Sequence, residues 1–368
     1  MEDPAAMSPL TVVDAGRVLD LPRDADAWLD RLPGPLAIRA RGRDATRTRL
    51  VSGMLHGNEP SGLRAIFHVL RLLRSGERFA TDAIFFVGAV EAARLPPRHS
   101  HRMLPGRRDL NRCFRPPYRD AEGHVAEALL ALAFVRARSA PLEAVVDLHN
   151  NSGHNPAYGV GVGLDAGRVG VTSLFAERYV ASSLSLGSLV EAFPDSVASV
   201  TVECGRAGER RADETAIAGL SAFLRAEHLP RIEPASSGMQ LLRDPVRVHV
   251  RSGLSLAFAE RDAAPAVDVT MDVDADRHNF QRLAPGTRIG WVREGAPWPL
   301  VALDARGKDV SGQLFAMHDH ALVTRRPLVP VMMTTNPSAA REDCLFYAVE
   351  DDGEIGAPRP PRTRCVRR

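Results

Sequence analysis

The sequence predicts an α/β fold, with helices layered on a central sheet, followed by a smaller β domain. Apolar segments of strand length alternate with helical stripes over the first part of the chain, which is the pattern of an α/β layer fold. After Pro230 the pattern changes to an alternation of apolar and polar residues, clearest over 267–274. We therefore expect an α/β domain at 1–230, a β domain at 231–350 and a surface tail rich in Pro and Arg at 351–368.

The expected elements of the α/β domain follow from the spacing of apolar residues. Continuous apolar runs predict strands that are covered on both faces, and apolar positions three and four apart predict helices. The expected strands are 34–40, 46–55, 83–90, 143–149 and 198–204. The expected helices begin at Pro60, cover 122–137 and 173–185, and follow a cap at Asp213.

Composition and charge exclude several classes of protein. Among the 368 residues, 45% are hydrophobic and 25% are charged, as in ordinary globular proteins. The 47 basic and 45 acidic residues leave a formal net charge of +2, which does not favour a nucleic-acid binder. The first ten residues lack the basic and apolar regions of a signal peptide, and no apolar run approaches the length of a membrane helix. The four cysteines form no CxxC pair. We expect a soluble, cytoplasmic protein.

Three short segments at strand ends carry residues suited to metal chemistry. His56 and Glu59 follow the second expected strand, and His149 stands at the end of 143–149. In open α/β sheets the ends of strands are where ligands bind. Two imidazoles and one carboxylate form the ligand set of a catalytic zinc site that keeps one position for water. The third segment carries Glu203, a carboxylate that could take a proton from water and pass it to a leaving amine.

An arginine-rich loop, 102–112, lies between the first two of these segments. Arginines near such a site can clamp a substrate carboxylate in bidentate fashion. One of them could also stabilise the oxyanion of a tetrahedral intermediate. The residues alone leave both roles open.

The segments HGNEPSG, RMLPGRRDLNRCF, DLHNNSG and TVECG, in this order, resemble the succinylglutamate desuccinylase/aspartoacylase family. That family is related to the zinc carboxypeptidases of the M14 type. The resemblance covers about residues 48–230, and weakly the β domain after them. It implies a mixed central sheet flanked by helices, with a C-terminal β domain that narrows the pocket.

The resemblance also implies a role for each matching residue. His56, Glu59 and His149 become the ligands of one Zn²⁺ per chain, and Glu203 becomes the general acid/base. Asn111 and Arg112 match the pair that binds the substrate carboxylate. Arg102 resembles the arginine that polarises the scissile carbonyl, although Arg107 and Arg108 are close in the same loop.

The chain departs from the aspartoacylase branch at one place. A further substrate-binding arginine is expected there about ten residues before the catalytic glutamate, and this chain has Glu191-Ala192-Phe193-Pro194 instead. A site for a second substrate carboxylate is therefore not predicted.

We expect a zinc-dependent hydrolase that cleaves the amide bond of an N-acyl amino acid or a similar small carboxylate. One alternative is a metallocarboxypeptidase-type peptide hydrolase, and another is a non-catalytic metal-binding scaffold. Glu203 argues against the scaffold, because a binding module needs no general base. We expect no nucleic-acid or membrane partner, and the sequence leaves the oligomeric state open.

Overall fold

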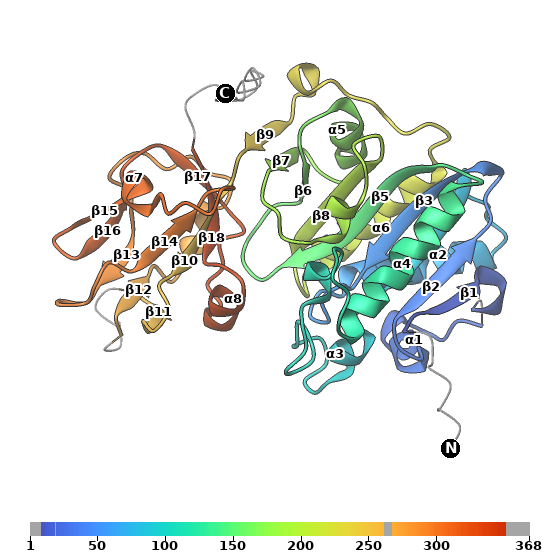
Figure 1. The fold of residues 1–368 in the computed structure, drawn as a ribbon, viewed down its shortest axis with the longest axis horizontal. Helices are drawn as coiled ribbons and strands as arrows, with labels where there is room; N and C mark the ends of the chain where they lie inside the picture. The colour runs from blue at the N-terminus through green and yellow to red at the C-terminus, as the bar shows by residue number, and fades with distance from the viewer. Residues whose placement is uncertain (1–8, 19, 261–266, 351–368) are drawn as a thin grey trace.

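A computed structural model describes residues 9–18, 20–260 and 267–350 (Figure 1). Its largest element is a nine-stranded sheet with the order β1-β2-β4-β3-β5-β8-β6-β7-β9. Strands β4, β3, β5 and β8 run parallel to one another, whereas β2 is antiparallel to β4 and β6 is antiparallel to β8. The sheet is therefore mixed, and the predicted α/β fold with a mixed central sheet is confirmed.

Strands β2, β3, β4, β5 and β8 begin and end close to the predicted positions, whereas β1, β6, β7 and β9 were not predicted as strands. Their bounds are β1 Thr11–Asp14, β2 Leu36–Ala40, β3 Asp44–Gly53, β4 Thr81–Val87, β5 Leu142–Asn151, β6 Tyr158–Val162, β7 Arg178–Ser182, β8 Ala198–Arg206 and β9 Gln240–Arg243. The central strands are almost wholly buried along their length, which explains their unbroken apolar sequence.

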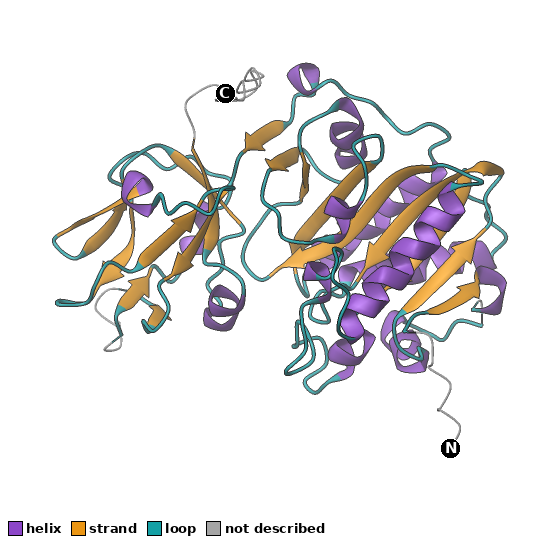
Figure 2. Cartoon of the chain, in the orientation of Figure 1, coloured by secondary structure: helices purple, strands orange, loops and turns teal. Residues whose placement is uncertain are grey.

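Helices cover both faces of the sheet (Figure 2). The helices are α1 Ala25–Arg31, α2 Ser61–Arg74, α3 Val90–Arg94, α4 Ala121–Ala137, α5 Ala166–Ser173 and α6 Arg210–Arg225. Leu63 and Ile66 of α2 share one core with Leu220 and Phe223 of α6, and Leu129 of α4 belongs to a second core on the opposite face. No helix in the described ranges is long and apolar enough to cross a membrane.

The C-terminal part of the chain forms two further sheets. The first has the order β14-β10-β18-β17 and the second β11-β12-β13-β16-β15. Their strands are β10 Val246–Val250, β11 Leu256–Phe258, β12 Val269–Met271, β13 Arg288–Val292, β14 Leu300–Leu303, β15 Phe315–His318, β16 Ala321–Thr324, β17 Leu328–Val331 and β18 Phe346–Glu350, with short helices α7 Ser311–Leu314 and α8 Pro337–Glu342. These sheets have their own core, which includes Val248, Val269 and Phe346.

The division of the chain at residue 231 stays a prediction. Strand β9 still belongs to the large sheet, where it pairs parallel to β7, and β10 is the first strand of the smaller sheets. The expected tail at 351–368 lies outside the described residues.

Two local predictions are wrong. The expected helix at 173–185 is instead the last residue of α5 followed by strand β7, which lies between β6 and β9. Helix α5 begins earlier because Asp165 accepts hydrogen bonds from the Gly167 and Arg168 amides and so caps the helix. Asp213 is not a cap either, since α6 begins at Arg210 and the Asp213 carboxylate accepts a hydrogen bond from Ser61 Oγ.

Candidate metal and catalytic site

Three neighbouring parallel strands bring the predicted metal ligands and the predicted base to one edge of the sheet. His56 and Glu59 lie in the turn from β3 to α2, His149 lies near the end of β5, and Glu203 lies near the end of β8. The order β3-β5-β8 makes these strands direct neighbours, and the His149 and Glu203 Cα atoms are partners in the β5–β8 pairing. His56 and Glu203, which are 147 residues apart in the sequence, are thereby brought to the same edge of the sheet.

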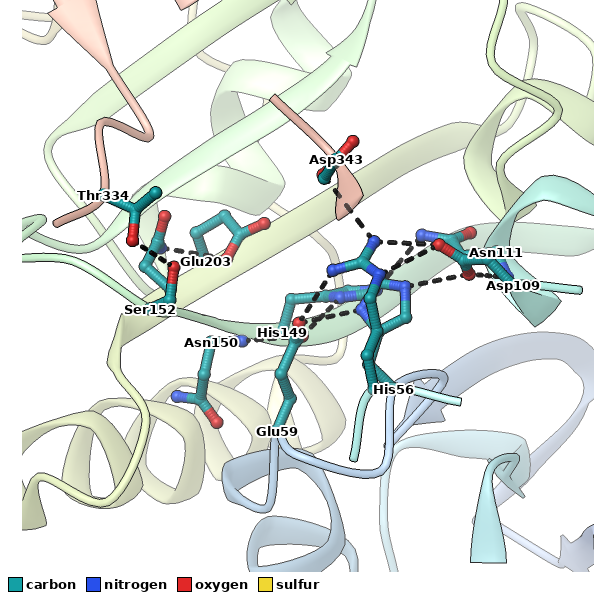
Figure 3. A network of polar contacts seen from close by, with 12 residues as sticks. His56, Glu59, Asp109, Asn111, His149, Asn150, Ser152, Glu203, Thr334 and Asp343 are labelled. Atoms are coloured by element: carbon teal, nitrogen blue, oxygen red, sulfur yellow. Dashed lines mark hydrogen bonds and ion pairs between the residues drawn. The ribbon is translucent and has the colours of Figure 1, made fainter. Parts of the chain in front are cut away.

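His56, Glu59 and His149 form a compact, buried group (Figure 3). One ligand atom from each lies within 4.8 Å of the others. The Nδ1 atom of His56 is 2.8 Å from Glu59 Oε1, and the Nδ1 atom of His149 is 2.7 Å from Glu59 Oε2. The two Nδ1 atoms therefore converge on one carboxylate.

The other ring nitrogen of each imidazole, Nε2, contacts a carboxylate other than that of Glu59. His56 Nε2 lies 3.0 Å from Asp109 Oδ1, and His149 Nε2 lies 2.7 Å from Asp147 Oδ2. An Nε2–H that donates to a carboxylate leaves Nδ1 as the free lone pair, which is how metal-binding histidines are commonly oriented. Two nitrogen donors and one carboxylate, each imidazole backed in this way, fit the ligand set of a catalytic zinc ion.

The sequence analysis missed both supporting carboxylates. Asp147 had a usable signal, because residues two apart on a strand point to the same face, and Asp147 precedes His149 by two. Asp109 had none, since it reaches His56 only through the folding of the loop between α3 and α4.

The charges in this group shift its protonation. Burial raises the pKa of Glu59, but the adjacent His56 and His149 outweigh burial and hold that pKa well below its usual range. Burial lowers the pKa of His149, but Asp147 and Glu59 outweigh it and raise that pKa well above its usual range. A metal ion must therefore displace protons from the imidazoles, which makes its affinity depend on pH.

Glu203 is held in place by a short chain of hydrogen bonds. Asn151 Nδ2 donates to Glu203 Oε2 over 2.9 Å, and the Tyr158 hydroxyl donates to Asn151 Oδ1 over 3.2 Å. Burial raises the pKa of Glu203 to about 7, against the opposing charge of His149. A carboxylate with a pKa near neutrality can both accept and return a proton.

Among the three candidate arginines of the loop, Arg102 is the one beside the ligand group. Its Nε and Nη2 atoms donate to Asp109 Oδ2 over 3.1 and 2.9 Å, and its Nη1 lies 3.6 Å from Glu59 Oε1. Arg107 and Arg108 point elsewhere, toward Glu122 and Asp120.

Asn111 and Arg112 are both engaged by the protein itself. Asn111 Oδ1 accepts a hydrogen bond from the Leu189 amide. Arg112 Nη2 lies 3.4 Å from Asp343 Oδ1, and Asp343 also pairs with Arg247. Asp343 directly follows helix α8, and sequence reasoning gave no signal for its presence here.

All seven predicted site residues line one cavity of about 520 Å³. They are His56, Glu59, Arg102, Asn111, Arg112, His149 and Glu203. The C-terminal part of the chain contributes Met332, Thr334 and Asp343 to the same cavity.

Part of the chain is similar to a known protein family. Residues 45–157 match the model of the succinylglutamate desuccinylase/aspartoacylase catalytic domain. None of the curated proteins matches the chain.

Solved structures share the fold over most of the chain. A succinylglutamate desuccinylase from Vibrio parahaemolyticus is 16% identical with a TM-score of 0.55, covering 83% of this chain and 82% of that one. A succinylglutamate desuccinylase/aspartoacylase from Rhodobacter sphaeroides is also 16% identical with a TM-score of 0.55, covering 85% and 88%. A succinylglutamate desuccinylase from Chromobacterium violaceum is 16% identical with a TM-score of 0.54, covering 86% of each chain. The resemblance seen in the sequence is confirmed, since residues 45–157 are similar to the catalytic domain of the succinylglutamate desuccinylase/aspartoacylase family.

Proposed function

We propose that the protein is a zinc-dependent hydrolase that cleaves the amide bond of an N-acyl amino acid or a similar small carboxylate. The observation that carries the proposal is the position of Glu203. This buried carboxylate with a raised pKa shares one cavity with the His56, Glu59 and His149 group. A metal-binding scaffold would have no use for such a group.

One zinc ion would be held by His56 Nδ1, His149 Nδ1 and the Glu59 carboxylate. When bound, zinc supplies a Lewis acid that makes water more acidic and polarises a carbonyl oxygen. Asp109 and Asp147 keep the two imidazoles in the tautomer that leaves Nδ1 free.

Glu203 would act as the general base and then as the general acid. It takes a proton from the attacking water and returns it to the departing amide nitrogen. Asn151 keeps the carboxylate oriented through its hydrogen bond to Oε2.

Two arginines would bind the substrate. Arg102, fixed by Asp109, would donate to the scissile carbonyl oxygen as negative charge develops there. Arg112 together with Asn111 would bind the substrate carboxylate, and Arg112 would exchange Asp343 for it.

We further propose that residues 231–350 form a domain that caps the cavity, in line with the position of Met332, Thr334 and Asp343 in its lining. We also propose a cytoplasmic location, with which the free thiols of Cys113, Cys204 and Cys344 agree.

The test is hydrolysis of a panel of N-acyl amino acids and short peptides by zinc-loaded protein, with and without a chelator. Cleavage of acyl amino acids that the chelator abolishes supports the proposal. Cleavage of peptides alone would make the protein a metallocarboxypeptidase-type hydrolase. Failure of the purified protein to bind zinc, with no cleavage of any substrate in the panel, would contradict the proposal and favour a non-catalytic scaffold.

A further inference from the structure

One side of the cavity is built from aliphatic side chains. Strands β6 and β7 and the loop after them contribute a surface that we call the aliphatic wall. It consists of Val160, Val162, Val180, Leu184, Leu186 and Val190. Val160, Val162, Leu184 and Leu186 are only partly buried by the protein, so they keep apolar surface open to an occupant.

Strand pairing places the nearest residue of this wall, Val160, opposite Thr201, which precedes Glu203 by two residues on β8. On β6 and β8, Tyr158 pairs with Glu203 and Val160 pairs with Thr201, so these side chains share one face of the sheet. On β7, Val180 pairs with Val160 and extends the same face. Neighbouring strands are about 4.8 Å apart, so the wall reaches about 10 Å from β8. That distance is longer than an acetyl group.

The wall presents no positive charge to the cavity, since Arg115, which donates to Ser185 Oγ over 3.0 Å, does not line it. No basic side chain of 158–191 lines the cavity, and its arginines, Arg102, Arg112 and Arg206, come from other elements. The acidic side chain that the segment contributes to the cavity is Glu191. Its carboxylate accepts hydrogen bonds from the Gly187 amide and Ser188 Oγ over 3.0 and 2.7 Å. A second carboxylate of the substrate would meet apolar surface and a negative charge here.

From this arrangement we propose that the substrate places an uncharged, apolar group of four or more carbons against the aliphatic wall, and that the wall excludes a second carboxylate. The group is either the acyl chain or the side chain of the amino acid, since both chemistries suit the wall. The proposal rests on the proposed function for the reaction, and concerns which substrate class the same cavity selects.

Binding of simple carboxylic acids tests the wall without requiring turnover. Calorimetry on zinc-loaded protein would compare 4-methylpentanoate, which has one carboxylate and a branched chain, with glutarate, which has two carboxylates. We expect 4-methylpentanoate to bind at least about tenfold more tightly. Equal or tighter binding of glutarate, or binding of neither acid, would overturn the inference.

Variants of the wall sharpen the test. Leu184→Arg, or Val162→Arg if the first does not fold, places a cation on the wall and should reverse the preference toward glutarate. Ser183→Arg is the matched control, because Ser183 is exposed and does not line the cavity. A folded Leu184→Arg protein with an unchanged preference would contradict the inference.

Turnover of two substrates shows whether the apolar group is the acyl chain or the side chain of the amino acid. Turnover also distinguishes failure of the proposed function from failure of this inference. Faster turnover of N-acetyl-leucine assigns the wall to the side chain, and faster turnover of N-(4-methylpentanoyl)glycine assigns it to the acyl chain. The predicted binding preference without turnover of any acyl amino acid would contradict the proposed function alone. Turnover that favours N-acetyl-aspartate would contradict the inference alone.

Discussion

Arg112 Nη2 lies 3.4 Å from Asp343 Oδ1, so the arginine that is expected to bind the substrate already forms an ion pair with a carboxylate of the protein. Burial raises the pKa of Asp343, but Arg102, Arg112 and Arg247 outweigh burial and lower it, which keeps this carboxylate charged at neutral pH. If Arg112 binds the substrate carboxylate as proposed, Asp343 would compete with the substrate for it.

Replacement of this competitor should tighten substrate binding. We expect Asp343→Asn to lower KM for an N-acyl amino acid about tenfold, because a neutral amide competes less well for Arg112. Steady-state kinetics measures the change, and thermal melting checks that the variant remains folded. A higher KM would show that Asp343 supports the substrate site rather than competing with the substrate.

Removal of the proposed base should stop the chemistry and spare the metal. We expect Glu203→Gln to lower kcat by about 10²–10⁴-fold, because an amide neither accepts nor returns the proton. The variant should still bind one zinc ion, since Glu203 is not among the three ligands. Elemental analysis and kcat are measured on the same sample, and normal turnover would remove Glu203 from the mechanism.

Loss of a supporting carboxylate should weaken metal binding. We expect Asp147→Asn to lower zinc affinity about 10–100-fold, because the amide no longer holds His149 through a charged hydrogen bond. Competition with a coloured chelator measures the affinity. Asp195→Asn serves as the control, since the Asp195 side chain is 94% exposed. Equal affinity of both variants would contradict the role of Asp147.

The arginine loop allows a paired comparison. Arg102→Ala should lower kcat by about 10²-fold or more, as loss of a single oxyanion donor commonly does. Arg108→Ala should leave kcat within about twofold, because Arg108 pairs with Asp120 at the surface. If the two effects were reversed, the carbonyl would be polarised by a different part of the loop.

A pH-dependent contribution to stability comes from Asp268 in the C-terminal part of the chain. Its carboxylate accepts hydrogen bonds from Ser255 Oγ over 2.7 Å and from Arg293 Nη2 over 2.5 Å. The pKa of Asp268 is lowered, first by Arg293 and then by Ser255. A lowered folded-state pKa stabilises the fold above the ordinary value of 3.8, and the stabilisation is lost as the pH falls through the folded pKa.

The melting temperature of Asp268→Asn should therefore be below that of the parent protein at pH 7. The difference should shrink as the pH falls below 3.8, because the Asp268 carboxylate takes up its proton in the unfolded chain before it does so in the folded protein. Calorimetric melting at a series of pH values measures both proteins. A difference independent of pH would mean that the ion pair contributes nothing through its charge.

The sequence by itself determined the α/β fold and the resemblance to the family, and it predicted the residues of the candidate site. Unbroken apolar runs mark the central strands, and each of His56, His149 and Glu203 stands at or just beyond the end of such a run. Because parallel strands end at the same edge of a sheet, local pattern was enough to predict that these side chains meet. The prediction of a helix at 173–185 is wrong because Tyr179, Val180 and Ala181 form a short buried stretch. For such a stretch, the spacing of apolar residues cannot distinguish a strand from a helix.

Only the tertiary structure decided which groups surround that site. Asp109 and Asp343 reach His56 and Arg112 through loop and domain packing, and these contacts span 53 and 231 residues of sequence. The aliphatic wall likewise depends on the pairing of β6 with β8 and β7, which sets Val160 beside Thr201 and Val180. Such long-range pairings cannot be predicted from local sequence, because they depend on how whole helices and strands bury their apolar faces against one another.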